Sequence, residues 1–293
     1  MGFKGIYKQK SAASKIGMFF LLIFISVILH TILAGVLIAL FSDNGMAILQ
    51  TQDLTNQVSV NYLKLMQLFS GVGLFIVPPL LYSYLTGFDF KFTRITRQNT
   101  ILVIAIMMLI TPFVGLLLEW NMKIPFPEWF LLFDKNSKVI VEAFLKMSTI
   151  WDLLYTLIVI AVVPAIGEEL LFRGYLQQNL DRWLNNSMLA IVITSFLFSA
   201  IHLDAQGVLP RFILGVLLGY LYYWGESLWM PILAHFVNNA QAVILSYPLF
   251  NVESAAYSAF PEAKTDPMMG LFSFFSVILL LYIFYQNVMI KKG

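Results

Sequence analysis

The sequence predicts an all-α fold: a polytopic bundle of about eight transmembrane helices that forms one membrane domain over residues 1–293. Hydrophobic residues make up 59% of the chain and charged residues only 12%, whereas soluble domains have about 45–50% apolar and about 25% charged residues. Long stretches also lack Asp, Glu, Lys and Arg altogether, and the hydrocarbon of a bilayer is the solvent that tolerates such surfaces. We therefore expect a multi-pass membrane protein surrounded by lipid.

Eight stretches free of charged side chains account for the predicted spans, since about 20 apolar residues at about 1.5 Å rise each cross the hydrocarbon. They are residues 16–41, 65–86, 100–118, 153–167, 187–203, 212–224, 228–248 and 269–290. The fourth and fifth need polar residues at their ends. The sixth is short alone and is expected to begin before Arg211.

The lysines and arginines predict the orientation, because they are enriched in cytoplasmic loops. With the N-terminus inside and eight crossings, the inner segments hold eleven of the 18 basic residues and only five of the 16 acidic residues. We therefore expect both termini in the cytoplasm. No eukaryotic targeting signal is visible, which favours a bacterial plasma membrane, and a net charge of +2 gives no reason to expect a nucleic-acid partner.

The longest polar stretch, residues 119–152, is expected outside the cell or at the outer interface. Pro125 and Pro127 interrupt any helix there. Residues 130–147 mix apolar and charged side chains, as helices that lie flat on a membrane do. We interpret this segment as a surface helix, with a role in substrate entry as the alternative.

Ionisable side chains gather at three places within or beside the predicted spans, where they are costly and usually functional. The three patterns are Glu168-Glu169-x-x-x-Arg173, Phe198-x-x-x-His202 and His235-x-x-x-Asn239. Residues four apart share one helix face, so Glu169 can pair with Arg173. Pro164 lies one turn before the glutamates and is expected to kink that span, which frees backbone groups for other helices or a cavity to satisfy.

The spacing from the predicted turns places these side chains at similar depths. Glu168 precedes Asn185 by 17 residues and His202 follows it by 17, so each lies roughly 25 Å from that turn along its helix. His235 and Asn239 lie roughly 13–20 Å beyond the turn that ends the sixth span. We expect one buried layer that contains a carboxylate, two imidazoles and a carboxamide.

This set of groups is suited to hydrolysis. Glu168 beside His202 can hold and deprotonate a water molecule, and His235 and Asn239 can donate to the oxyanion that forms when water attacks a carbonyl. A catalytic zinc ion is the competing use, with Glu168, His202 and His235 as ligands and an open fourth position. Asparagine is a poor zinc ligand, which favours the version without a cofactor. The chain has no cysteine, so thiolate nucleophiles and thiolate metal sites are excluded.

The three patterns, in this order on successive apolar spans, resemble those of the CAAX protease and bacteriocin-processing family of intramembrane endopeptidases, which is related to the CAAX prenyl endopeptidase of eukaryotes. The resemblance covers residues 153–247, which we interpret as the catalytic core. It implies a membrane-associated peptide or protein substrate. It further implies roles for six residues: water activation by Glu168 and His202, oxyanion stabilisation by His235 and Asn239, and supporting positions for Glu169 and Arg173.

Two functions of other classes remain open. A proton- or cation-coupled transporter would use carboxylates and histidines at mid-membrane equally well, although the chain shows no inverted repeat. A non-catalytic immunity or scaffold protein would not need Glu168 or His202.

Several other residues are interpreted as structural. His30 is expected to pack or to form a helix–helix hydrogen bond, and Gly215 and Gly219 have the spacing of tightly packed helices. Phe198 is interpreted as packing beside the site and Arg211 as a loop residue.

Overall fold

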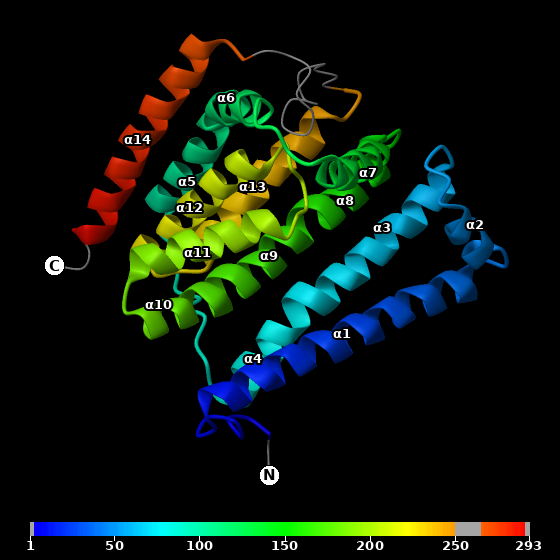
Figure 1. The fold of residues 1–293 in the computed structure, drawn as a ribbon, viewed down its shortest axis with the longest axis horizontal. Coiled ribbons are helices and arrows are strands. Elements are labelled where there is room, and N and C mark those ends of the chain that lie inside the picture. The colour runs from blue at the N-terminus through cyan, green and yellow to red at the C-terminus, as the bar shows by residue number, and fades with distance from the viewer. Residues whose placement is uncertain (1–2, 250–264, 291–293) are drawn as a thin grey trace.

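The computed structural model describes residues 3–249 and 265–290, except for the side chains of residues 132–136 (Figure 1). The helices are α1 (Ala12–Phe41), α2 (Gly45–Thr51), α3 (Gln57–Gly71), α4 (Val77–Thr86), α5 (Arg97–Leu109), α6 (Thr111–Asn121), α7 (Glu128–Leu145), α8 (Ile150–Thr156), α9 (Val163–Glu169), α10 (Gln178–Leu184), α11 (Ser187–Ala200), α12 (Val208–Gly225), α13 (Trp229–Leu245) and α14 (Pro267–Met289). The π-helical segments η1 (Val72–Ile76), η2 (Leu157–Val162) and η3 (Leu170–Gln177) connect some of them. Within these ranges there is no strand, which confirms the all-α prediction.

The helices are apolar enough for a multi-pass membrane protein, but fewer have full length than the sequence predicts. Five candidate spans occur among the described residues: Ala12–Phe41, Gln57–Thr86, Ile150–Leu184, Val208–Gly225 and Pro267–Met289. The pair α5 and α6, bent by 41°, makes a sixth if it is counted as one span. α11 has 14 residues and α13 has 17, so at about 1.5 Å per residue both are shorter than roughly 30 Å of hydrocarbon. Eight crossings and cytoplasmic termini stay predictions.

The second span begins at Gln57. The sequence prediction placed its start at residue 65, because Lys64 interrupts the charge-free stretch. Lys64 is fully buried, and its Nζ donates to Thr156 Oγ1 at 2.8 Å. The rings of Phe144 and Tyr155 lie 5.7 and 6.0 Å from the same nitrogen, within reach of a cation–π interaction. A search for charge-free stretches misses the start of this span, since the partners of Lys64 are distant in sequence.

The helix that carries the two glutamates runs without a break from Ile150 to Leu184, beyond the predicted end at Gly167. Its backbone passes through η2 just before Pro164. A π-helical turn accommodates the proline by widening the helix, and such turns are frequent at functional sites.

α11 ends at Ala200, three residues before the predicted end of the fifth span, so His202 lies in the following turn and not on the helix. Leu203 has a φ of 50°, which is the left-handed conformation that ends helical geometry. Asp204 Oδ1 then accepts a hydrogen bond from Gly207 N at 2.9 Å and turns the chain toward α12.

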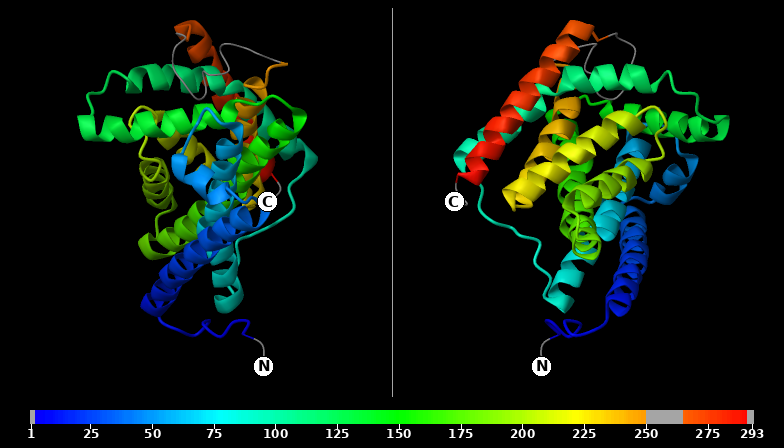
Figure 2. Two further views of the ribbon diagram at one scale, coloured as in Figure 1. Left: turned by 90° about the vertical axis from the view of Figure 1, so that its right-hand side faces the viewer. Right: turned by 60° about the vertical axis from the view of Figure 1, so that its left-hand side comes forward.

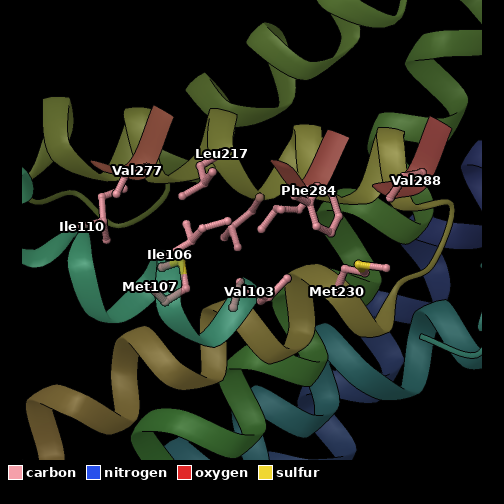
Figure 3. Close-up of a cluster of buried hydrophobic side chains, with 12 residues drawn as sticks. Val103, Ile106, Met107, Ile110, Leu217, Met230, Val277, Phe284 and Val288 are labelled. Atoms are coloured by element: carbon pink, nitrogen blue, oxygen red, sulfur yellow. The ribbon is translucent and has the colours of Figure 1, made fainter. Parts of the chain in front are cut away.

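Four helices share the largest buried apolar cluster, to which α5, α12, α13 and α14 contribute (Figure 3). The members labelled in Figure 3 are Val103, Ile106, Met107 and Ile110 of α5, Leu217 of α12, Met230 of α13, and Val277, Phe284 and Val288 of α14. α5 packs on α13 and α14, and α12 packs on α13 and α14, so this core holds α12 and α13 in place.

The small residues singled out in the sequence do allow close helix packing. A Cβ on Gly215 would lie 3.0 Å from Ser195 Cβ, and one on Gly219 would lie 2.8 Å from a methyl of Ile191, so α12 approaches α11 closely. His30 packs on a third glycine, Gly73 of η1. Its Nδ1 donates to Ser26 O at 2.8 Å, so this bond lies within α1 and not between helices.

α7 lies across one end of the molecule, together with α6 (Figure 2). It begins directly after Pro127 and agrees with the surface helix expected over residues 130–147. Ala143 and Phe144 near its end are buried against α3 and η2. Lys138 donates to Gln206 in the loop between α11 and α12. α7 is therefore fixed at both places, while its side of the membrane stays a prediction.

Candidate active site

A buried ion pair lies next to the cavity of the site. Arg173 Nη1 donates to Glu169 Oε1 at 2.7 Å, and both side chains are fully buried. Arg173 Nη2 donates to the carbonyl of Gly215 at 2.9 Å, an atom left accessible by the absence of a side chain there. The guanidinium also lies 4.6 Å from the ring centre of Phe198. The pair predicted from the four-residue spacing thus connects the glutamate helix to α11 and α12.

Glu169 accepts a second hydrogen bond, from a histidine on α13. Nδ1 of His235 lies 2.8 Å from Glu169 Oε1, and a carboxylate can only accept, so this nitrogen carries the proton. The Nε2 atom on the other side of the ring then has a free lone pair in the neutral imidazole. Glu169 therefore orients His235, as a carboxylate orients the histidine of a hydrolytic triad.

The second histidine is oriented in the same way by the backbone. Nδ1 of His202 lies 2.7 Å from the carbonyl oxygen of Phe198, which again requires Nδ1 to donate. The ring of Phe198 contacts both imidazoles, with centroid distances of 5.1 Å to His202 and 5.8 Å to His235. Packing by Phe198 and the two Nδ1 bonds hold both Nε2 atoms in defined positions.

Glu168 lies where the two Nε2 atoms converge. Its Oε2 is 3.8 Å from His202 Nε2 and 3.9 Å from His235 Nε2. These separations exceed the hydrogen-bond range of about 2.7–3.2 Å. The oxygen is buried and has no hydrogen-bond partner among the described residues. A buried carboxylate oxygen without a partner is costly, so this position is prepared for a molecule that donates to it.

Asn239 reaches the site through the backbone defect of the glutamate helix. Pro164 has no N–H to donate to the carbonyl four residues earlier, that of Ile160. Nδ2 of Asn239 donates to this carbonyl at 3.0 Å. Asn238 Nδ2 donates to Asn239 Oδ1 at 3.1 Å. The carboxamide is thereby fixed, with the second hydrogen of Nδ2 left for another acceptor.

One cavity of about 370 Å³ connects these groups. Its lining includes Glu168, His202, His235 and Asn239, contributed by α9, the turn after α11, and α13. Glu169 and Arg173 lie behind this lining. The structure thus brings together all six residues singled out in the sequence.

Arg211 also lines this cavity, and the sequence interpretation of it as a loop residue is wrong. It lies in the first turn of α12, and its Nη2 donates to Asp204 Oδ2 at 2.8 Å. Its Nη1 is buried without a hydrogen-bond partner among the described residues. The expected early start of the sixth helix was the one signal that could have placed it on α12.

The donor set does not match a tetrahedral zinc site as it stands. Zinc bonds of about 2.0–2.1 Å hold tetrahedral donor atoms roughly 3.4 Å apart. Glu168 Oε2 lies 3.8 and 3.9 Å from the two Nε2 atoms. Among the described residues no group of three His, Cys, Asp or Glu side chains has a geometry that could hold a metal ion.

Comparison with known proteins matches the same part of the chain. Residues 150–241 match the family model described as type II CAAX prenyl endopeptidase Rce1-like, which confirms the resemblance over this region and points to a CAAX-type endopeptidase. The chain is also 32% identical over 88 residues to the uncharacterized protein YpbD of Bacillus subtilis (strain 168). That alignment covers 29% of this chain and 42% of the relative, so the chain spans about two fifths of the relative's length. No solved structure matches.

Proposed function

We propose that this chain is an intramembrane endopeptidase that cleaves a membrane-associated peptide or protein with a water molecule activated by Glu168. The premise is the match of residues 150–241 to the CAAX prenyl endopeptidase family. The observation that carries the proposal is the unpartnered, buried Oε2 of Glu168, which faces the Nε2 atoms of His202 and His235 at 3.8 and 3.9 Å.

A water oxygen fits between Glu168 and His202. Two atoms 3.8 Å apart can both lie about 2.8 Å from a third atom, which is the length of a good hydrogen bond. Such a water donates one hydrogen to Glu168 Oε2 and the other to Nε2 of His202, so its lone pair faces the cavity. Glu168 accepts the proton as the water oxygen attacks the substrate carbonyl carbon.

The oxyanion formed by this attack needs donors, and two side chains can supply them. The second hydrogen of Asn239 Nδ2 is available, because the first is used by the Ile160 carbonyl. His235 can donate from Nε2 only as an imidazolium, so it takes up one proton from solvent when the substrate binds and releases it with the products. The Glu169 carboxylate 2.8 Å from Nδ1 offsets the positive charge. Both side chains are held in place by hydrogen bonds before the substrate arrives, which makes such stabilisation effective.

Collapse of the tetrahedral intermediate completes the reaction. The carbon–nitrogen bond breaks, and the carboxylic acid of Glu168 returns its proton to the leaving amine nitrogen. The products are a new carboxyl terminus and a new amino terminus, and Glu168 is again a carboxylate. Water supplies all the atoms that are added.

Substitution of Glu168 tests the proposal in liposomes that contain the purified protein and a library of lipid-anchored, fluorogenic peptides. Glu168→Gln keeps the shape of the side chain but removes the base, and we expect cleavage to fall by at least about 10²-fold. Removal of a positioned general base alone costs about 10²–10⁴-fold. The matched control is Glu142→Gln on the exposed face of α7, which is expected to cleave at the wild-type rate.

Wild-type cleavage by Glu168→Gln would rule out the protease. Proton or cation uptake by the same liposomes, abolished by Glu168→Gln, would support a transporter, and full function of Glu168 and His202 variants in vivo would support a non-catalytic partner.

A zinc-dependent form of the same protease has its own test. Elemental analysis of the purified protein and cleavage after chelation address it directly, and we expect chelator-treated protein to retain its activity. Loss of cleavage in chelator, restored by zinc, would keep the protease and replace the metal-free mechanism.

A further inference from the structure

A second cavity, of about 320 Å³, lies at the end of the molecule that carries the N-terminus. Its lining comes from the N-terminal segment, α1, α4 and the helix end at η3 and α10. Three of the lining residues are cationic, Lys8, Lys15 and Arg182, and none of those described is acidic. Neither Glu168 nor its partners touch this cavity, so it is separate from the candidate active site.

The N-terminal segment is held at this cavity by backbone hydrogen bonds. Gly5 N donates to Tyr84 O at 2.9 Å and Tyr7 N donates to Leu85 O at 2.8 Å. Carbonyls in the last turn of a helix have no partner within that helix, so α4 offers an attachment for the segment. Nζ of Lys15 in turn donates to the carbonyl of Lys8 at 2.9 Å. The two lysines are thus part of a folded pocket and not of a loose basic tail.

Arg182 reaches the cavity from the opposite wall. Its guanidinium carbon lies 4.6 Å from the ring centre of Phe88, and its Nη2 donates to Gln178 Oε1 at 3.3 Å. A guanidinium stacked on a ring still presents donors along its edge, in the fork geometry that suits a phosphate.

The ion pairs found among the described residues involve neither Lys8 and Lys15 nor Arg182. Three like charges around one cavity repel each other, and they attract an anion from outside the chain.

The floor of the cavity is rigid and aromatic. Tyr175 stacks on Phe19 with ring centroids 3.7 Å apart, and Tyr82 meets Tyr175 edge-on at 4.8 Å. Trp183 at the rim is 53% exposed, as expected of a side chain at the boundary between lipid tails and headgroups. The cavity therefore has charged side chains at its opening and apolar surface beside it, where three candidate spans end.

We infer that this basic pocket, formed by Lys8, Lys15, Arg182, Tyr82 and Tyr175, binds the phosphate of an anionic phospholipid headgroup. Basic pockets between transmembrane helices recognise such headgroups. The charged side chains meet the phosphate while Trp183 and the apolar faces of α1 and α4 remain beside the acyl chains. The inference does not depend on whether the residues around Glu168 catalyse proteolysis.

Lipid binding to the purified full chain in detergent tests this inference, measured by native mass spectrometry and by thermal unfolding. We expect the wild type to bind phosphatidylglycerol at least tenfold more tightly than phosphatidylcholine, and to unfold at a higher temperature when the anionic lipid is present. The triple variant Lys8→Gln/Lys15→Gln/Arg182→Gln should lose this preference. The matched control Lys4→Gln/Lys10→Gln/Arg94→Gln removes the same charge from residues that do not line the pocket, and it should keep the preference.

Competition with inorganic phosphate distinguishes binding of a lipid headgroup from binding of free phosphate. Displacement of the lipid by millimolar phosphate would assign the pocket to free phosphate, whereas no displacement at a large excess would assign it to the lipid headgroup. Equal binding of both lipids by the wild type, or phosphatidylglycerol binding by the triple variant as tight as by its control, would overturn the inference. Should the triple variant not fold, Arg182→Gln alone is expected to weaken binding at least threefold, and unchanged binding would count equally against the pocket.

Discussion

Replacement of Arg173 by methionine tests how much the candidate site depends on its buried ion pair. Arg173 donates to Glu169 Oε1 at 2.7 Å and to the Gly215 carbonyl at 2.9 Å, and both charged side chains are fully buried. Methionine fills much of the same volume but leaves the carboxylate without its cation, which costs about 3–5 kcal/mol. The orphaned carbonyl adds about 1–3 kcal/mol. We therefore expect the free energy of unfolding to fall by about 4 kcal/mol or more.

Reversible unfolding in mixed detergent micelles measures this change, and a second variant separates its causes. Glu169→Gln/Arg173→Met removes the uncompensated carboxylate charge, so we expect it to be more stable than Arg173→Met alone by about 2 kcal/mol. Arg94→Met, at an exposed position, is the control and should change stability by about 0.5 kcal/mol or less. If Arg173→Met is as stable as this control, or the double variant is no more stable than the single one, the buried ion pair does not stabilise the fold.

Variants of Asn239, Pro164 and Gly167 test the backbone hydrogen bonding and the helix packing next to Glu168. Asn239→Ala should lower kcat by about 10²–10³-fold through loss of an oxyanion donor, and stability by about 1–3 kcal/mol through loss of the bond to Ile160. In a Pro164→Ala background the N–H of residue 164 can donate to the Ile160 carbonyl. The loss of stability caused by Asn239→Ala should then be smaller in unfolding assays, while the loss of kcat stays the same. A loss of kcat that becomes smaller to the same extent would make Asn239 purely structural. Gly167→Ala places a Cβ 2.6 Å from that of Phe75 and should destabilise by about 1–3 kcal/mol, and wild-type stability would contradict this packing.

Local patterns predicted the parts of the site that helix geometry determines. The spacing of Glu169 and Arg173 predicted their ion pair, since residues four apart share a helix face, and the pair forms. Equal distances from the turn at Asn185 predicted that Glu168 and His202 lie at one level, and their side chains approach to 3.8 Å, although His202 lies just beyond the end of α11. Both predictions use rises and angles that are nearly constant in helices.

Contacts between segments that are distant in sequence could not be predicted in this way. His235 donates to Glu169 and not to Glu168, across 66 residues of chain, and only packing decides which carboxylate it meets. The cost of a lysine in lipid predicts that the second span begins after Lys64, yet Thr156 Oγ1 accepts a hydrogen bond from Lys64 although the two are 92 residues apart. A charge is excluded from a span only when no partner is available there, and the partner is a property of the fold.

The turn after α11 illustrates a further limit. The apolar run continues to Leu203, so hydropathy extends the helix to that residue, but the backbone leaves the helix after Ala200 and Leu203 adopts a left-handed conformation. The consequence is functional, because His202 in this turn points its Nε2 toward Glu168. Hydropathy reports where a segment is apolar and not where its hydrogen bonds end.

The proposed mechanism requires Glu168 and His202 to hold a water molecule without a metal ion. An experimental structure of the protein purified without chelator, refined at a resolution that shows ordered water and recorded on both sides of the zinc absorption edge, measures this directly. We expect an oxygen about 2.6–3.2 Å from both Glu168 Oε2 and His202 Nε2, with no anomalous signal at that position. A zinc signal there, or a closed gap without water between the two side chains, would refute the metal-free mechanism.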